Sequence, residues 1–248
     1  MRNFELSTHV KVISRSSGHT ATAAAAYRSG DRIRCDRSER THDYRRRNGV
    51  VLSDIILPNG NPSLSRSQLW NAAEAKENRK NSRTARELMF SLPVELSPEG
   101  RESVVRRMAD HLASNHGLAV DIAIHAPPVD GDARNHHAHL LMTTRRMVGG
   151  VLKEKSRELD DKATGPEIVK DWRRIIADLL NAQIAKEQEA KPVHVEHRSF
   201  AERGIDRQPS KHHGKHRYRP VDWILRQFRK VANWRTKGAY FSLQKHSP

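Results

Sequence analysis

The sequence predicts an α+β fold in which a central antiparallel sheet of about five strands carries helices on one face. Two observations predict it. Several segments alternate apolar and polar residues with the period of two that is typical of half-buried strands, and other segments repeat apolar residues at helical spacing. A sheet and helices packed around one core suit a chain of 248 residues.

The first strand is expected over residues 4–13, where apolar and polar side chains alternate. A polar turn then leads into an alanine-rich helix, which Gly30 ends as a C-terminal cap. The one large functional side chain of this helix is Tyr27. A tyrosine near a helix end is more often a packing residue with an exposed hydroxyl, but a phenol can also be a nucleophile toward a phosphodiester. Both interpretations stay open here, and three other tyrosines compete for the role: Tyr44, Tyr218 and Tyr240.

Residues 31–47 are highly charged and are expected to form a loop. The run DYRRR within it, with Arg45 and Arg46, is a candidate phosphate-contacting cluster, although a solvated run of charges is the commoner outcome. A strand is expected over residues 50–58, and a polar helix over residues 65–79.

Residues 85–93 alternate again and predict a strand with its leucines and Phe90 toward the core. Glu87 faces the other way. A carboxylate there can orient a histidine or take a proton, and it can equally pair with a surface arginine. The Ser97–Pro98 pair then opens a helix that Gly117 closes.

Three histidines mark the next two strands, 118–125 and 136–145. If these strands pair as a hairpin, His125, His137 and His139 share one face and converge. Three imidazoles hold a divalent metal with coordination positions left open, whereas a structural zinc site usually has four ligands, often cysteines. His136 precedes the pair, but strand alternation turns it toward the core.

The remaining chain is expected to hold a charged loop, an amphipathic helix over residues 167–186, and a C-terminal segment rich in Arg, Lys, Trp and Tyr. Basic residues interleaved with aromatic ones suit single-stranded nucleic acid, because bases stack and phosphates pair with cations. A disordered basic tail is the alternative. We expect residues 1–190 to form the catalytic domain, and residues 191–248 to form a basic extension that covers bound DNA.

The net charge of +16 favours a polyanionic partner, and nucleic acid is the first candidate. A single cysteine, Cys35, excludes an intramolecular disulfide and suits a reducing cytoplasm. The sequence has no apolar run of membrane-spanning length and no secretory signal at its start. We therefore expect a cytoplasmic protein without membrane insertion.

The order of these motifs resembles the MobA/MobL family of plasmid mobilisation relaxases, which belong to the HUH endonucleases. The resemblance spans about residues 4–214, and five segments carry it: ISRSSGHTATAAAAYRSG, HDYRRRNGVVLSDIILP, ELMFSLP, AIHAPPVDGDARNHHAHLLMTTR and EHRSFAERGIDRQPSKHHG. It implies that Tyr27 is the nucleophile and that His125, His137 and His139 hold the metal. The implied metal is Mn²⁺ or Mg²⁺, with Zn²⁺ or Ni²⁺ as occupants of a purified sample. Glu87 is carried over as a proton acceptor or histidine orienter.

The resemblance also implies a function. A bacterial relaxase nicks one DNA strand at a plasmid transfer origin, stays attached through a 5′-phosphotyrosine, and reseals the strand, together with accessory relaxosome proteins and a coupling protein. The alternatives are a non-catalytic DNA-binding protein with a structural metal, and a rolling-circle replication initiator, in which the tyrosine follows the histidines. The expected DNA contacts are Arg15, Arg28, Arg45, Arg46, Asn135, Arg145, Arg198 and His212.

Overall fold

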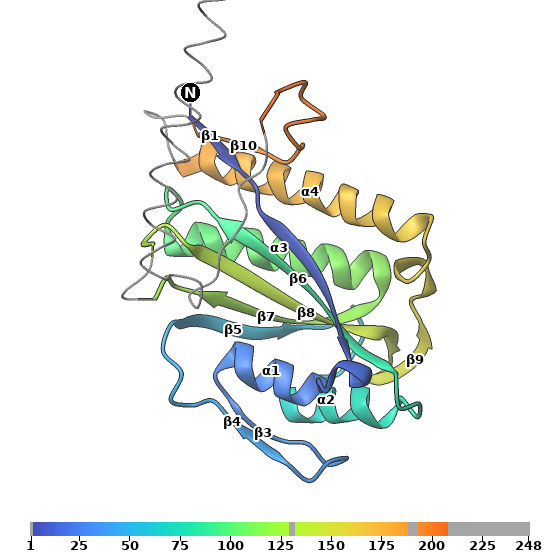
Figure 1. Cartoon of the computed structure of the whole chain (residues 1–248). Coiled ribbons are helices and arrows are strands. Elements are labelled where there is room, and N and C mark those ends of the chain that lie inside the picture. Colours follow the sequence, from blue (N-terminus) through green and yellow to red (C-terminus); the bar gives the residue numbers. More distant parts are fainter. Residues whose placement is uncertain (1, 129–131, 188–192, 208–248) are drawn as a thin grey trace, which may run out of the picture. The chain divides into compact units, whose positions relative to one another are not determined.

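A central antiparallel sheet organises the computed structural model of the protein (Figure 1). The structure describes residues 2–128, 132–187 and 193–207. The sheet runs in the order β2–β6–β8–β7–β5, and β9 pairs with the far end of β8. Its strands are β2 (Thr8–Ser14), β5 (Val50–Ile56), β6 (Arg83–Leu92), β7 (Leu118–His125), β8 (His136–Val148) and β9 (Val151–Lys155). The predicted α+β class and the antiparallel sheet are confirmed.

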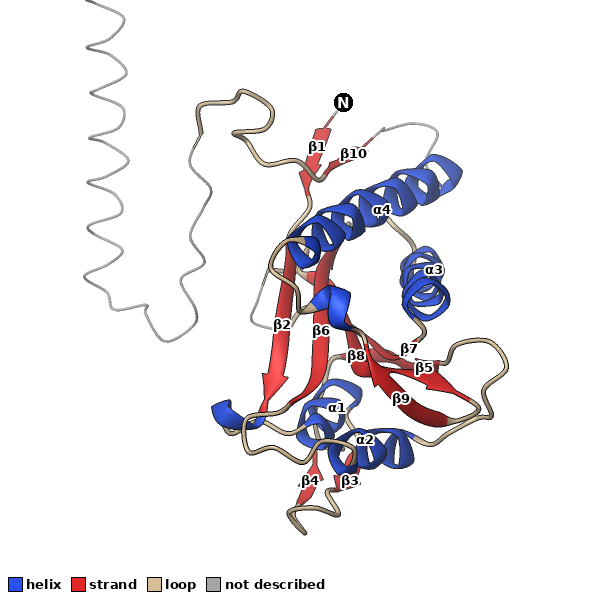
Figure 2. Cartoon of the chain, turned by 90° about the vertical axis from the view of Figure 1, so that its right-hand side faces the viewer, coloured by secondary structure: helices blue, strands red, loops and turns tan. Residues whose placement is uncertain are grey.

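Two long helices, α3 (Pro98–His116) and α4 (Thr164–Glu187), cover one face of this sheet (Figure 2). The larger core lies beneath them, because every second residue of β6, β7 and β8 points to that side. Phe90 of β6 and Trp172 of α4 are its largest fully buried side chains. This layer corresponds to the helices that the sequence predicted on one face.

The opposite face carries a second, smaller layer made by α1 (Ala21–Ser29) and α2 (Arg66–Ala75). Alanines of α1 pack with Trp70 of α2 and with Ala119 of β7, so the helix approaches the sheet closely. As a result, β7 is buried along its whole length on both faces. The prediction of helices on one face only is therefore wrong, because α1 and α2 cover part of the opposite face. The C-terminal end of α1 contacts His125 at the end of β7.

The ends of α1 follow from its sequence. Its N-cap, Thr20, accepts a hydrogen bond from the backbone N–H of Ala23, and its C-cap, Gly30, has φ +73°, a conformation that favours glycine. The predicted alanine-rich helix ending at Gly30 is confirmed.

Several short strands were not expected. Residues 31–47, predicted as a loop, contain a small hairpin of β3 (Arg32–Arg34) and β4 (Thr41–Asp43), and β9 lies in another predicted loop. The strand expected over residues 4–13 is divided into β1 (Arg2–Glu5) and β2. β1 leaves the main sheet to pair in parallel with β10 (Val193–Glu196). A charged strand of three residues is too short to show an alternation of apolar and polar side chains. Such a strand is recognised only by its pairing with a neighbouring strand.

The chain divides into two units after His197. The first unit therefore includes β10, which lies beyond the boundary predicted at residue 190. Two short 3-10 helices, Arg15–Ser17 and Arg157–Leu159, complete its elements. No helix within the described ranges is long and apolar enough to cross a membrane.

Candidate active site

Three imidazoles converge where β7 ends and β8 begins. His125 lies directly opposite His137 in the β7–β8 register, and His139 lies opposite Ala123. One nitrogen of each ring falls within 4.8 Å of the others. Since His125 and His139 are buried and His137 is half-buried, the cluster has one side open to solvent. The predicted convergence of these three side chains is present.

The other ring nitrogen of each histidine is occupied by a hydrogen-bond partner. His125 Nε2 lies 2.7 Å from the Arg28 carbonyl oxygen, His137 Nδ1 lies 3.0 Å from the Asn135 carbonyl oxygen, and His139 Nδ1 lies 2.6 Å from Glu87 Oε1. These oxygens accept from protonated ring nitrogens, which leaves Nδ1 of His125 and Nε2 of the other two rings as electron-pair donors. Such outer partners are what orient histidine ligands toward a metal.

The protonation of the cluster suits metal binding. Burial lowers the pKa of His125 to about 4, and burial also lowers the pKa of His137. Both rings are therefore neutral near pH 7, as metal ligation requires. A donor set of three imidazoles fits a divalent cation, and unlike carboxylates these ligands do not cancel its charge.

Glu87 of β6 is held on both of its oxygens. Arg28 of α1 makes a bidentate ion pair with it, and His139 donates to the oxygen Oε1. Burial alone would raise the pKa of Glu87, but the hydrogen bonds from His139 and Arg28 outweigh burial and hold this pKa at about 2. The carboxylate is therefore ionised and fully bonded, which suits the orientation of His139 better than the acceptance of a proton.

Tyr27 lies near the C-terminal end of α1, and 46% of its surface is exposed. Its neighbour Arg28 contributes the carbonyl that binds His125, so the end of α1 is fastened to the cluster. The ring of Tyr44 contacts that of Tyr27 edge-on at 5.2 Å. The side chain of Tyr27 is therefore accessible from solvent and is not sunk among aliphatic side chains.

Arg47 links Tyr27 to the histidines, and sequence reasoning did not single it out. Its guanidinium carbon lies 3.7 Å from the centre of the Tyr27 ring, and its Nη1 donates to the Tyr27 carbonyl oxygen at 2.7 Å. Its Nη2 lies 3.5 Å from His125 Nδ1. The DYRRR run was the available signal, but nothing in it separates Arg47 from Arg45 and Arg46.

The other predicted DNA contacts near the cluster have different surroundings. Arg45 is exposed and pairs with Asp43 two residues away, and Arg46 is exposed in the same loop. Asn135 is also exposed, and the contact that it makes with the site is through its carbonyl oxygen to His137. Arg28 is committed to Glu87 and to the Ala24 carbonyl.

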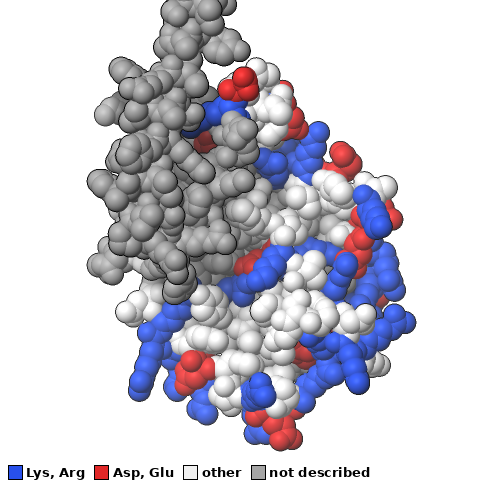
Figure 3. All heavy atoms as spheres, viewed as in Figure 1, with Lys and Arg blue, Asp and Glu red and all other residues white. Residues whose placement is uncertain are grey.

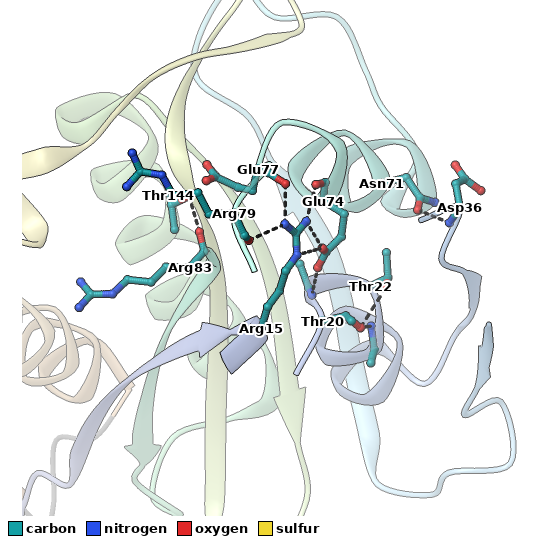
Figure 4. A network of polar contacts seen from close by, with 12 residues as sticks. Arg15, Thr20, Thr22, Asp36, Asn71, Glu74, Glu77, Arg79, Arg83 and Thr144 are labelled. Atoms are coloured by element: carbon teal, nitrogen blue, oxygen red, sulfur yellow. Dashed lines mark hydrogen bonds and ion pairs between the residues drawn. The ribbon is translucent and has the colours of Figure 1, made fainter. Parts of the chain in front are cut away.

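Arg15 and Arg145 have partners within the protein at other places. All three guanidinium nitrogens of Arg15 donate to Glu74, Glu77 and Arg79, which fastens α2 and its following loop beside α1 (Figure 4). Arg145 lies near the opposite end of β8 from His137 and pairs with Glu77. These contacts favour structural roles over the predicted phosphate contacts.

Two further predicted contacts lie outside the first unit. Arg198 is the first residue of the second unit, and its side chain is exposed. His212 lies outside the described residues.

The surface around the site is basic. A hollow of about 350 Å³ lies next to Tyr27 and is lined by cations and aromatic rings, including Lys11, Arg40, His42 and Tyr44. No acidic residue is among its described lining residues. Away from this end of the sheet, Figure 3 shows further Lys and Arg side chains along the lower part and the right-hand edge of the molecule. Such a surface attracts a polyanion.

Comparisons with known proteins show which relatives the chain has. The chain is 36% identical to the mobilization protein MobL of Acidithiobacillus ferridurans over 82% of its own length and 60% of that protein. It is 29% identical to the probable mobilization protein MobA of Bifidobacterium longum, over 83% of its length and 42% of that protein. It thus spans only about half the length of these relatives.

A solved structure has the same fold. It comes from work described as the molecular basis of vancomycin resistance transfer in Staphylococcus aureus, and it matches with a TM-score of 0.67 and 28% identity. The match covers 78% of this chain and 99% of that one. The model of the MobA/MobL family matches residues 19–220, which include Tyr27, Glu87 and all three histidines. The chain therefore belongs to the MobA/MobL family.

Proposed function

We propose that this chain is a relaxase that cuts one strand of DNA at a transfer origin through Tyr27 and reseals it. The observation that carries the proposal is the position of Tyr27: an exposed phenol at the end of α1, linked through Arg28 and Arg47 to His125, one of three convergent imidazoles. A nucleophile beside a metal-binding cluster, in a basic surface, is the arrangement that phosphodiester transfer requires.

In the proposed reaction the Tyr27 hydroxyl oxygen attacks the phosphorus atom of one phosphodiester. The bond between phosphorus and the 3′-oxygen breaks, and that oxygen takes a proton while the phenol loses one. The 5′-phosphate remains on Tyr27 as a phosphodiester, so a free 3′-hydroxyl can later reverse the step. A water nucleophile would instead end the reaction by hydrolysis.

The residues around Tyr27 have separate tasks. His125, His137 and His139 would hold a divalent cation, Mn²⁺ or Mg²⁺ under working conditions, which polarises the phosphate when it is bound. Glu87 fixes the ring of His139, and Arg28 fixes Glu87. Single-stranded DNA would lie across the basic surface next to the 350 Å³ hollow.

The relatives support this assignment. Several are named mobilization proteins, and others, from Rhizobium radiobacter and Agrobacterium fabrum, are named conjugal transfer proteins TraA. These names refer to mobilization and to conjugal transfer. Accessory relaxosome proteins and a coupling protein would be partners of this chain in that process.

Formation of a covalent protein–DNA adduct tests the proposal. Single-stranded oligonucleotides that tile the replicon encoding the chain would be incubated with the protein and Mn²⁺, and separated on denaturing gels. We expect one oligonucleotide to yield an adduct that survives SDS and is absent in Tyr27→Phe. The adduct should also disappear in His137→Ala and His139→Ala, with DNA binding partly kept because cations supply most of it.

Two results would contradict the proposal. An adduct that persists in Tyr27→Phe but vanishes in Tyr44→Phe would move the nucleophile to the neighbouring ring. Binding of Mn²⁺ and DNA with no adduct on any tile would favour a DNA-binding protein with a structural metal.

A further inference from the structure

Arg47 holds a position that the roles described so far leave unexplained. It follows β4 in the loop that leads to β5, and its guanidinium lies between the Tyr27 ring and the histidine cluster. Its backbone N–H donates to the Tyr44 carbonyl oxygen at 2.8 Å, which fixes the turn that carries it. One of its nitrogens is anchored on the Tyr27 carbonyl oxygen. The guanidinium is therefore held in place before any substrate binds.

The charge of Arg47 has no acidic counterpart in the part of the chain that the structure describes. Its contacts are with an aromatic ring, a carbonyl oxygen and an imidazole nitrogen. The nearby carboxylate of Glu87 is already bonded to Arg28 and His139. A half-buried guanidinium without a carboxylate is suited to an anionic ligand.

We propose that Arg47 binds a non-bridging oxygen of the phosphodiester that Tyr27 attacks, while the face of the same guanidinium holds the Tyr27 ring. This inference rests on the proposed function. Arg47 stays protonated throughout and forms no covalent bond. It donates hydrogen bonds to a non-bridging oxygen, whose negative charge grows as the Tyr27 oxygen approaches phosphorus. A preorganised donor accelerates a reaction most when it faces an atom on which charge develops in the transition state.

The same geometry predicts that Arg47 opposes metal binding in the absence of DNA. Because His125 Nε2 bonds to the Arg28 carbonyl oxygen, Nδ1 is the His125 nitrogen available to a metal. Arg47 Nη2 lies 3.5 Å from this Nδ1. The guanidinium therefore faces a ligand atom with a positive charge and disfavours a second cation there. A phosphate placed between the two cations removes the repulsion. Metal and DNA should consequently bind the wild-type protein cooperatively.

The test uses two variants and a control in the full chain. Arg47→Gln removes the charge, and Arg47→Lys keeps it without the planar fork. Arg174→Gln is the control, because it removes one positive charge from an exposed position on α4, which lies on the other face of the sheet. Affinity for Mn²⁺ without DNA would be measured by calorimetry, and the rate of adduct formation would be measured under single-turnover conditions with the reactive oligonucleotide.

We expect Arg47→Gln to bind Mn²⁺ more tightly than Arg174→Gln, on the order of tenfold, yet to form the adduct about 100-fold more slowly. Arg47→Lys should keep the wild-type affinity for Mn²⁺ and show an intermediate rate.

A purely structural role for Arg47 would slow the reaction without tightening Mn²⁺ binding, and this result would overturn the inference. So would equal rates in Arg47→Gln and Arg174→Gln. The absence of any adduct in the wild-type protein would instead count against the proposed function, whereas unchanged Mn²⁺ affinity in Arg47→Gln counts against Arg47 alone.

Discussion

Glu87 illustrates at the residue scale how hydrogen bonding decides what a buried carboxylate can do. Its oxygens are occupied by a guanidinium and an imidazole, and these bonds keep its pKa at about 2 in spite of burial. A general base near neutral pH works best when its pKa lies close to that pH. Of the two roles expected from the sequence, the orientation of His139 is the one that this geometry favours.

Glu87→Gln separates these two roles. An amide still fills the space but no longer accepts a charge-assisted hydrogen bond from His139, so affinity for Mn²⁺ should fall by about 10–100-fold. Calorimetric titration would measure this, with Glu102→Gln as the control, since the side chain of Glu102 on α3 is 40% exposed. Loss of adduct formation at unchanged Mn²⁺ affinity would show that Glu87 acts as the base.

At the scale of the elements, a buried ion pair holds α1 and α2 together. Glu74 of α2 accepts from the backbone N–H of Ala21, the first residue of α1, and binds Arg15 (Figure 4). The side chains of Arg15 and Glu74 are 9% and 1% exposed. A carboxylate at a helix N-terminus also interacts favourably with the helix dipole. This network therefore sets the position of the helix that carries Tyr27.

Substitution of Arg15 should reveal this structural role. Arg15→Met leaves the Glu74 carboxylate buried without its cation and should lower the free energy of unfolding by about 3–5 kcal/mol. Arg45→Met removes a cation from an exposed pair and should change it by less than about 0.5 kcal/mol. Urea unfolding would measure both. Equal, small effects would mean that Arg15 is dispensable to the fold.

The contact between α3 and α4 should give stability a pH dependence through His116. Trp172 Nε1 donates to His116 Nε2 at 3.3 Å, so the ring must be neutral to accept, and burial lowers the pKa of His116. In the unfolded chain the His116 imidazole has its ordinary pKa of about 6.5. Just below pH 6.5 the unfolded chain therefore binds a proton at His116, whereas the folded chain does not. Stability from this group is thus complete above about pH 6.5 and is lost as pH falls.

Unfolding free energies at pH 7.5 and pH 5.5 would check this. We expect His116→Gln, which can accept from the indole without titrating, to lose less stability between these values than the wild-type protein. Parallel losses in the two proteins would contradict the assignment, since other histidines titrate in both.

Much of the site was predictable because it depends on local patterns. Strand alternation placed His125, His137 and His139 on one face, and capping residues defined α1 and its tyrosine. Long-range packing was not predictable. The distinction between Arg47 and Arg45 depends on the path of a loop, and the commitment of Arg15 to Glu74 depends on a helix far along the chain. The small hairpin of β3 and β4 exists only through its pairing.

The charge of the whole molecule should govern its affinity for DNA. A chain with a net charge of +16 neutralises phosphates and releases counterions. The logarithm of the association constant for single-stranded DNA should fall linearly with the logarithm of salt concentration, by about 0.7 per phosphate contact. Five contacts would give a slope of about −3.5.

Fluorescence anisotropy with a labelled oligonucleotide at several salt concentrations would measure this slope. His137→Ala should leave the slope nearly unchanged, because the imidazole carries no charge near pH 7. A slope near zero in the wild-type protein would mean that base stacking, and not phosphate neutralisation, dominates binding.

The parallel pairing of β1 with β10 has a consequence for biosynthesis. Asn3 and His194 are partners in this ladder, so its first strand emerges from the ribosome long before its second. Until residue 196 has been translated, the edge of β1 remains unsatisfied and is open to pairing with another nascent chain. Premature termination just before β10 should therefore yield a product that aggregates, although it contains every residue of the histidine cluster and Tyr27.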